Sequence, residues 1–285
     1  MSPARALQAD SGFVIGRSHQ DTAKPCQDYA LAGHGGALAW ALVSDGCSTG
    51  GLTDIGARLW VHAARQVLTA ATALPDDLGR LHEQVQAHAR PLLQPFAAED
   101  AYATLGLVVG DGERARAALW GDGLVAALST SGELQCWEVH YALNAPRYPA
   151  YDAACDAVAA HLARWQQLVR DSEVCIQHLR CDAAGRVLDQ HTGRRAAATH
   201  PGLWLAWDDL APLQALLVCT DGVASTPGRT ALDSVRELLQ VRNPNGQFLR
   251  RRLGALARSW RRNPGQAQAP VDDLGAAALW WSDRP

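Results

Sequence analysis

Aspartate followed by glycine occurs four times in the 285-residue sequence, at residues 45–46, 111–112, 122–123 and 221–222. Asp-Gly is a favoured dipeptide of type I′ hairpin turns. The same carboxylate, together with a nearby peptide carbonyl, is also a ligand that hard cations such as Mg²⁺ and Mn²⁺ prefer. The residues on either side of each pair help to decide between a turn and a metal site.

The pair at Asp111 lies in "LVVGDGERARAAL", where the apolar runs on both sides indicate strand, turn and strand. We therefore interpret Asp111 as a turn residue. Asp122 lies in "WGDG", also between two strand-like runs, so its local sequence leaves both uses open.

Asp45 and Asp221 have different surroundings, because each follows a near-continuous apolar run and precedes a glycine-containing loop and a helix. A hairpin turn cannot explain this arrangement. Asp272 and Asp273 mirror it, since they directly precede the apolar strand "LGAAALWW". A carboxylate at the end of a buried strand must be hydrogen bonded or paired with a cation, because burying it bare is very costly.

Carboxylates that distant segments place at strand ends predict a Mg²⁺ or Mn²⁺ site. The glycine after each aspartate would let a peptide carbonyl approach the ion as a further ligand. Two such ions about 3.5–4 Å apart can hold a bridging water, lower its pKa and direct it at a phosphorus atom.

The elements that must position these residues follow from the apolar spacing. Strand-like runs from residue 103 onward are separated by short links at 110–114, 121–123 and 131–133, which we interpret as hairpins between antiparallel neighbours. Amphipathic helices are predicted at 52–70, 78–94, after the Pro-rich segment 144–152, at 230–241 and at 247–261, with Pro91 and Pro95 ending the second. Runs of strands beside pairs of helices predict one α+β domain, residues 1–285, with helices outside antiparallel sheets.

The composition excludes several classes of protein. A net charge of −3 without an extended basic run gives no reason to expect nucleic acid as a partner. The sequence has no signal-peptide pattern and no apolar stretch of about 18 residues, which predicts a cytoplasmic protein without a membrane partner. The seven cysteines stand singly, so zinc is not expected. The Arg-rich segment 250–262 could bind an acidic partner, but the acidic overall charge favours a solvated helix face.

Five blocks in order add a resemblance to this pattern: "GRSHQDTAKPCQDYA", "ALVSDGCS", "ATLGLVV…AALWGDG", "LLVCTDGV" and "VDDLGAAAL". Together they resemble the metal-dependent type 2C serine/threonine protein phosphatases, in particular the bacterial branch whose first motif ends in Cys-Gln-Asp. The blocks cover nearly the whole chain, from about residue 12 to residue 281.

The resemblance implies a sandwich of two antiparallel β-sheets flanked by pairs of α-helices. It also implies hydrolysis of phosphoserine and phosphothreonine in proteins by a metal-bridged hydroxide, without a covalent intermediate. The cofactors would be two Mn²⁺ or Mg²⁺ ions with a third, weaker one, held by Asp28, Asp45, the Gly46 carbonyl, Asp122, Asp221 and Asp272. Asp45 would bridge both main ions, and Asp122 would hold the third.

The chain departs from the family pattern at two positions. Cys47 stands where many relatives carry a histidine proposed as general acid, and Ala23 stands where an arginine would grip the phosphate. Lys24 or Arg17 could replace that arginine, although a lysine lacks the bidentate fork. His19 could donate a proton or orient a water, or it could be structural.

Three functions stay open. The first is a Mn/Mg-dependent protein phosphatase whose partner is a phosphorylated protein, for example a Ser/Thr kinase or its target. The second is a catalytically weak or inactive regulatory or binding module that keeps the fold. The third is a hydrolase of some other phosphoester, because two metals and a water do not select protein substrates.

Overall fold

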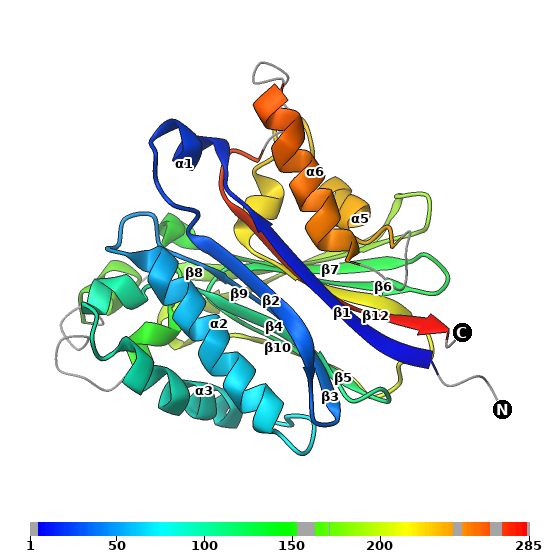
Figure 1. Ribbon diagram of the computed structural model, residues 1–285, viewed down its shortest axis with the longest axis horizontal. Coiled ribbons are helices and arrows are strands. Elements are labelled where there is room, and N and C mark those ends of the chain that lie inside the picture. Colours follow the sequence, from blue (N-terminus) through cyan, green and yellow to red (C-terminus); the bar gives the residue numbers. More distant parts are fainter. Residues whose placement is uncertain (1–4, 153–162, 171, 242–246, 263–269, 284–285) are drawn as a thin grey trace.

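The computed structural model describes residues 5–152, 163–170, 172–241, 247–262 and 270–283. These residues form two antiparallel β-sheets that pack together, with helices outside them (Figure 1). The seven-stranded sheet contains, in order, β1 (Arg5–Val14), β12 (Leu274–Asp283), β11 (Leu213–Cys219), β6 (Gly123–Ser129), β7 (Leu134–Tyr141), β8 (Glu173–Cys181) and β9 (Val187–Ala196). The five-stranded sheet contains β10 (Leu203–Trp207), β5 (Ala115–Trp120), β4 (Leu105–Gly110), β3 (Leu38–Asp45) and β2 (Asp28–Gly35).

Helices cover the outer faces of the sheets in pairs, which confirms the predicted α+β class. The pair on the five-stranded sheet is α2 (Thr53–Ala70) and α3 (Leu78–Leu93), and the pair on the seven-stranded sheet is α5 (Ala231–Leu238) and α6 (Phe248–Arg262). The short connecting helices are α1 (Arg17–Asp21), η1 (Ala98–Ala101), η2 (Ala142–Asn144), η3 (Pro149–Asp152), η4 (Ala197–Thr199) and η5 (Asp221–Ala224). No helix in the described ranges is long and apolar enough to cross a membrane.

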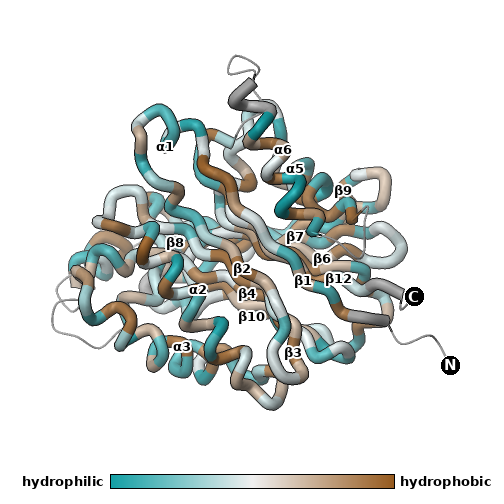
Figure 2. Tube along the Cα trace, viewed as in Figure 1, coloured by the Kyte–Doolittle hydropathy of each residue, from teal (hydrophilic) through white to brown (hydrophobic). Residues whose placement is uncertain are grey.

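The apolar runs of the sequence become central strands with both faces covered. In β11, Leu216 and Val218 join the cluster shared with the five-stranded sheet, whereas Leu217 and Cys219 pack under α5 and α6. This alternation is the two-residue period of a strand between two apolar layers. Figure 2 shows apolar residues concentrated along the strands. Such rigid strands fix where the polar residues at their ends lie.

Two of the predicted links are hairpins and one is not. The links at 110–114 and 131–133 join paired strands, β4 with β5 and β6 with β7. The prediction for 121–123 was wrong, because β5 and β6 belong to different sheets. Gly121 (φ +93°) and Gly123 (φ +135°) have positive φ angles that favour glycine, so the chain can cross between the sheets here. The crossing leaves Asp122 where the two sheets meet.

Two further predictions concern helix bounds. Pro91 was expected to end a helix but lies inside α3, which continues to Leu93. Proline removes one amide donor, yet the last turn still closes through the Gln94 amide, which donates to the Arg90 carbonyl at 3.1 Å. The helix predicted after residue 152 lies partly outside the described residues, as does Cys155, and residues 163–168 are helical.

Candidate active site

Three aspartates from three strand ends meet where the two sheets come together. Asp28 opens β2 and Asp45 ends β3, and the two residues lie directly opposite each other in the antiparallel register. Asp221 begins η5, two residues after β11 ends. The Asp45 carboxyl group hydrogen bonds with those of Asp28 and Asp221. The strand register therefore brings together three carboxylates that are far apart in the sequence.

Thr220 holds this cluster in place from the seven-stranded sheet. Its hydroxyl donates a hydrogen bond to Asp28 Oδ2 at 2.5 Å and accepts one from the Gly275 amide at 2.9 Å. Asp28 and Thr220 are each only 1% exposed. The bond ties β2 to β11 and β12, so the Asp28 side chain has little freedom to turn away.

Burial and mutual repulsion act on every carboxyl group of this cluster. Burial is the largest cause that raises the pKa of Asp28 and of Asp45, and the charges of Asp28 and Asp221 raise the pKa of Asp45 further. Burial and the Asp221 charge raise the pKa of Asp122 to about 7. Burial and then the Asp272 charge raise the pKa of Asp221. All of these shifts disfavour ionisation of the cluster unless a cation enters it.

The described residues supply no such cation by an ion pair. No lysine or arginine in the described ranges is within ion-pair distance of Asp28, Asp45, Asp122, Asp221 or Asp272. His140 acts on Asp122 and Asp221 only at longer range, and its Nε2 lies 3.0 Å from Glu138.

The donor set fits a hard cation, since it consists of carboxylate oxygens and the carbonyl of Gly46. Only glycine suits position 46, because an added Cβ would lie 2.7 Å from the Thr53 carbonyl oxygen. Within the described part of the chain, however, no three His, Cys, Asp or Glu side chains are already arranged to hold an ion. The chemistry of the site fits a divalent metal, and the ligand set remains a prediction.

The two adjacent aspartates before β12 have different surroundings. Asp273 is 2% exposed, and its carboxylate accepts hydrogen bonds from the Gly16 and Gln27 amides, both at 2.6 Å. Asp272 is partly exposed, and its charge acts on Asp221. Asp272 therefore lies within electrostatic range of Asp221, and its role as a ligand stays a prediction, whereas Asp273 fastens the segment between β1 and β2. Sequence reasoning missed that second task, although an Asp-Asp doublet at the start of a strand points its two side chains to opposite sides.

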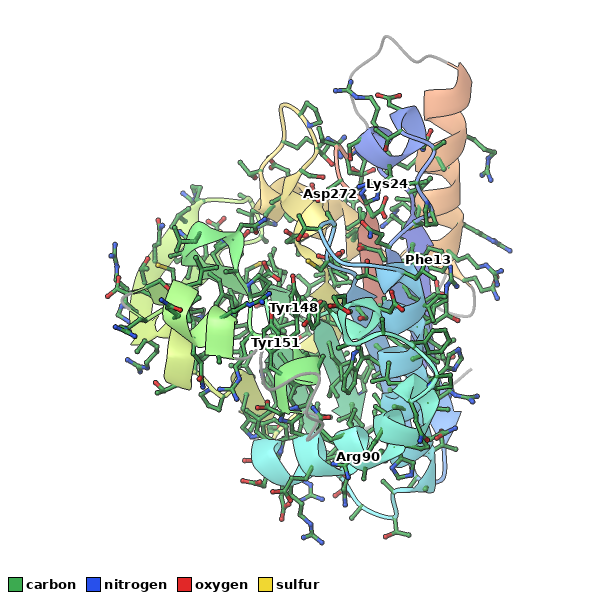
Figure 3. The ribbon with its side chains drawn as sticks, turned by 90° about the vertical axis from the view of Figure 1, so that its left-hand side faces the viewer. Phe13, Lys24, Arg90, Tyr148, Tyr151 and Asp272 are labelled. Atoms are coloured by element: carbon green, nitrogen blue, oxygen red, sulfur yellow. The ribbon has the colours of Figure 1, made fainter. Side chains whose placement is uncertain are left out.

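The predicted site residues of the first motif also differ in their surroundings. His19 is 6% exposed, and its Nδ1 lies 2.8 Å from Asp273 Oδ2, which is the surrounding of a structural histidine. Lys24 is exposed and lies at the same end of the molecule as Asp272 (Figure 3). Arg17 is also exposed, and its amide donates to the Pro270 carbonyl at 3.1 Å. Of these side chains, His19 is held in place, whereas Lys24 and Arg17 are exposed and form no ion pair with a described carboxylate.

The loop after Asp45 is fixed by Gln27, the middle residue of the Cys-Gln-Asp sequence. Its amide group donates to Thr53 Oγ1 at 2.6 Å, and Thr53 in turn donates to the Cys47 carbonyl at 2.9 Å. The Cys47 thiol lies close enough to Tyr148 to help raise the pKa of its hydroxyl. Cys47 thus faces the site, at the position where a general acid was considered.

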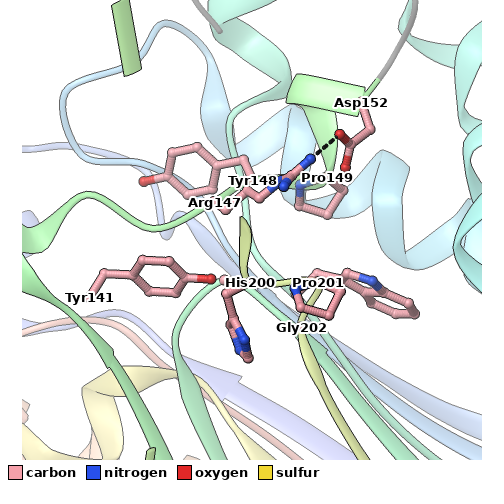
Figure 4. Close-up of a pocket in the computed structure, with 10 residues that line it drawn as sticks. Tyr141, Arg147, Tyr148, Pro149, Asp152, His200, Pro201 and Gly202 are labelled. Atoms are coloured by element: carbon pink, nitrogen blue, oxygen red, sulfur yellow. Dashed lines mark hydrogen bonds and ion pairs between the residues drawn. The ribbon is translucent and has the colours of Figure 1, made fainter. Parts of the chain in front are cut away.

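The Pro-rich segment 144–152 forms one wall beside the cluster. Tyr148 is buried and lies near Asp45 and Asp122, and burial raises its pKa well above the usual value. A small pocket lies behind this wall, between Arg147, Tyr141 and His200 (Figure 4). Its volume of roughly 10 Å³ holds about one water. Arg147 is ion-paired with Asp152 at 2.5 Å, and the volume of the pocket is too small for a phosphoryl group.

Comparison with solved structures identifies the fold. PppA, described as a key regulatory component of T6SS in Pseudomonas aeruginosa, has a TM-score of 0.56 at 18% identity, over 97% of this chain and 98% of that chain. The Staphylococcus aureus serine/threonine phosphatase Stp1 has a TM-score of 0.53 at 11% identity, over 98% and 97%. The chain has the fold of solved serine/threonine phosphatases. The S. agalactiae serine/threonine phosphatase is a further match, with a TM-score of 0.52 at 13% identity over 96% and 99%.

The sequence comparison agrees over the first part of the fold. The family model described as Protein phosphatase 2C matches residues 15–140, which include Asp28, Asp45 and Asp122. No curated protein matches the chain. The neighbours and the family model thus agree with the recognised resemblance at the level of type 2C phosphatases, while the Cys-Gln-Asp branch stays a prediction.

Proposed function

We propose that the protein is a Mn²⁺- or Mg²⁺-dependent phosphatase that hydrolyses phosphoserine and phosphothreonine in proteins. The observation that carries this proposal is the convergence of Asp28, Asp45 and Asp221 in a phosphatase fold, with no lysine or arginine paired to them in the described part. The pKa values of these carboxyl groups are raised, so a bound divalent cation would stabilise their ionised form. Structural clusters are normally neutralised by arginine or lysine, so this arrangement favours a functional site.

The chain's own residues would divide the work as follows. Asp221 and Asp272 would complete one ion and Asp28 would hold the other. Asp45 would contact both ions, the Gly46 carbonyl would contact one of them, and Asp122 would help to hold a third. Two bound divalent metal ions would neutralise phosphate charge and activate a water for in-line attack.

The remaining residues would place the substrate. The phosphate would be contacted by the ammonium group of Lys24, a point charge, or by the forked guanidinium of Arg17. Asp273 would keep the segment that carries both residues fixed through its hydrogen bonds with the Gly16 and Gln27 amides. Tyr148 and Cys47 would line the site on the side of segment 144–152.

The first experiment is hydrolysis of p-nitrophenyl phosphate by the purified protein, with and without Mn²⁺. We expect activity that requires Mn²⁺ and falls by at least about 100-fold in Asp45→Asn. Asp111→Asn is the matched control, because Asp111 belongs to the hairpin Asp-Gly pair at the β4–β5 turn. Its activity should stay within about twofold of the wild type.

The same assay distinguishes the proposed phosphatase from the regulatory module and from a hydrolase of other phosphoesters. If the protein is folded but turns over no substrate with any divalent ion, the regulatory module is favoured over the enzyme. The cysteine at position 47 and the alanine at position 23 would then explain the loss of turnover. Turnover of aryl phosphate without preference for phosphopeptides would favour a hydrolase of other phosphoesters. Preference for phosphoseryl or phosphothreonyl peptides would support the proposal in full.

A further inference from the structure

A groove of about 670 Å³ runs beside α6, along the edges of both sheets. Its walls are the end of β1 (Ser11, Gly12, Phe13), the start of β2 (Tyr29, Ala30, Leu31) and one face of α6 (Gln247, Arg250, Arg251, Gly254, Arg258). β1 and β2 are the last strands of their respective sheets. Figure 1 shows both strands beside one another, between α2 and α6.

The groove and the candidate active site share strand β2. Tyr29 lines the groove and directly follows Asp28, the first residue of β2. The ring of Phe13 lies 5.3 Å from that of Tyr29, centre to centre, and Phe13 pairs in register with Gly275, whose amide is hydrogen bonded to Thr220. Asp28 points to Thr220 and the cluster, whereas Tyr29 points to Arg58 of α2, because successive side chains of a strand face opposite sides. The cluster and the groove therefore lie on the two sides of the β2 edge.

The arginine side chains of this groove have no ion-pair partners among the described residues. Arg250, Arg251 and Arg258 are exposed, and none of them forms an ion pair with a carboxylate of the described residues. Elsewhere Arg194 is paired with Glu173 at 2.9 Å and Arg180 with Glu133 at 3.0 Å. Unpaired guanidinium groups that converge on one groove supply a positive potential in a protein whose net charge is −3.

The spacing along α6 also shapes the groove. Arg250, Gly254 and Arg258 recur every four residues and therefore share one helix face. A Cβ at Gly254 would meet only the Arg258 guanidinium, at 3.4 Å, so the glycine leaves open space between the two arginines. Gly12 of β1 allows α6 to approach, because a Cβ there would lie 3.1 Å from the Arg250 Cα.

An acidic peptide fits these walls better than a nucleic acid does. The guanidinium of Arg58, on α2, lies 4.8 Å from the centre of the Tyr29 ring and 5.8 Å from that of Phe13, so it already stacks on both rings. The rings are therefore not a free platform for bases. The two sheet edges, in contrast, offer main-chain groups to an extended peptide, and the arginines offer forked donors to carboxylates.

We propose that this groove docks an acidic segment of the phosphorylated protein, close in sequence to the phosphorylated residue. Docking would raise the local concentration of the phosphate at the carboxylate cluster and so select substrates with aspartate or glutamate near the target residue. The inference rests on the proposed function for its biological meaning, but binding of an acidic peptide does not depend on turnover.

The binding test uses the full chain and a fluorescein-labelled 12-residue peptide rich in Asp and Glu, at about 0.15 M salt. We expect binding by fluorescence anisotropy that weakens at least about tenfold in Arg250→Glu/Arg251→Glu. Gly254→Leu should also weaken it, because it fills the groove without changing charge and replaces a poor helix former. Arg80→Glu/Arg90→Glu on α3 is the charge-matched control and should bind as the wild type does; Figure 3 shows Arg90 far from Phe13.

The outcomes separate the groove from the catalytic proposal. A phosphopeptide with an acidic flank should show a raised KM in the Arg250→Glu/Arg251→Glu variant, while p-nitrophenyl phosphate turnover stays unchanged. If no substrate is turned over, the proposed function fails while the anisotropy result still decides the groove. The docking proposal is overturned if the acidic peptide does not bind, if the α3 control loses as much affinity, or if single-stranded DNA of equal charge binds more tightly and is lost in the same variants.

Discussion

Asp28 and Asp45 lie opposite each other across β2 and β3 with their carboxyl groups hydrogen bonded, and neither has a lysine or arginine partner among the described side chains. Two ionised carboxylates cannot share a hydrogen bond, so one of them must carry a proton or the two must separate around a cation. This relationship links the stability of the protein to metal and to pH.

Metal binding should therefore be visible as stability, independently of turnover. Without divalent ions, Asp45→Asn should raise the free energy of unfolding by about 1 kcal/mol, because it removes one of two buried like charges. In wild-type protein, Mn²⁺ at 100 times its dissociation constant should add about 2.7 kcal/mol, and Asp45→Asn should lose most of this gain. Thermal and urea unfolding with and without Mn²⁺ measure both effects. An equal gain in wild type and variant would place the metal elsewhere.

The same cluster predicts the pH dependence of the metal-free protein. Asp28, Asp45, Asp122 and Asp221 all have raised pKa values, so the folded state binds more protons than the unfolded state above the ordinary aspartate range. The free energy of unfolding should then fall as the pH rises from about 4 through about 7, the pKa of Asp122. Asp122→Asn should remove the part of this slope nearest pH 7. Urea unfolding in metal-free buffer tests the slope, and a rise in stability over this range would contradict it.

Substitutions of the adjacent residues Asp273 and Asp272 should affect stability and turnover differently. Asp273→Ala removes the acceptor for the Gly16 and Gln27 amides and the partner of His19, and should lower the free energy of unfolding by about 3 kcal/mol. Asp272→Ala should cost less than about 1 kcal/mol in metal-free protein, yet abolish Mn²⁺-dependent turnover. Hydrogen exchange at Gly16 and Gln27 should accelerate only in Asp273→Ala. Equal losses in the two variants would refute this division.

The sequence was sufficient for the features that depend on apolar periodicity. Asp45 and Asp221 follow the buried runs of β3 and β11, so their places at strand ends follow from pattern alone. The bounds of α2 and α6 were predicted to within about two residues for the same reason.

The features that the sequence could not supply depend on which sheet a strand joins. Local turn chemistry is the same whether Asp122 closes a hairpin or carries the chain between sheets, and only the pairing of β5 with β4 and of β6 with β11 decides. Likewise, no local pattern tells that Asp273 reaches Gly16, which is 257 residues away. The role of β1 was similarly hidden, because "RALQADSG" has too few apolar residues to stand out as a strand.

Phosphate recognition provides the last prediction, because the position where relatives carry an arginine is Ala23, with φ +54°. Lys24 is exposed beside it and has no carboxylate partner among the described residues. Lys24→Ala should raise KM for p-nitrophenyl phosphate by about tenfold with kcat within about threefold, since an exposed point charge binds ground state and transition state alike. Lys24→Arg should restore KM, and Arg17→Ala should change it less. A fall in kcat at constant KM would instead show that Lys24 acts on the transition state, and no change in either constant would transfer the role to Arg17.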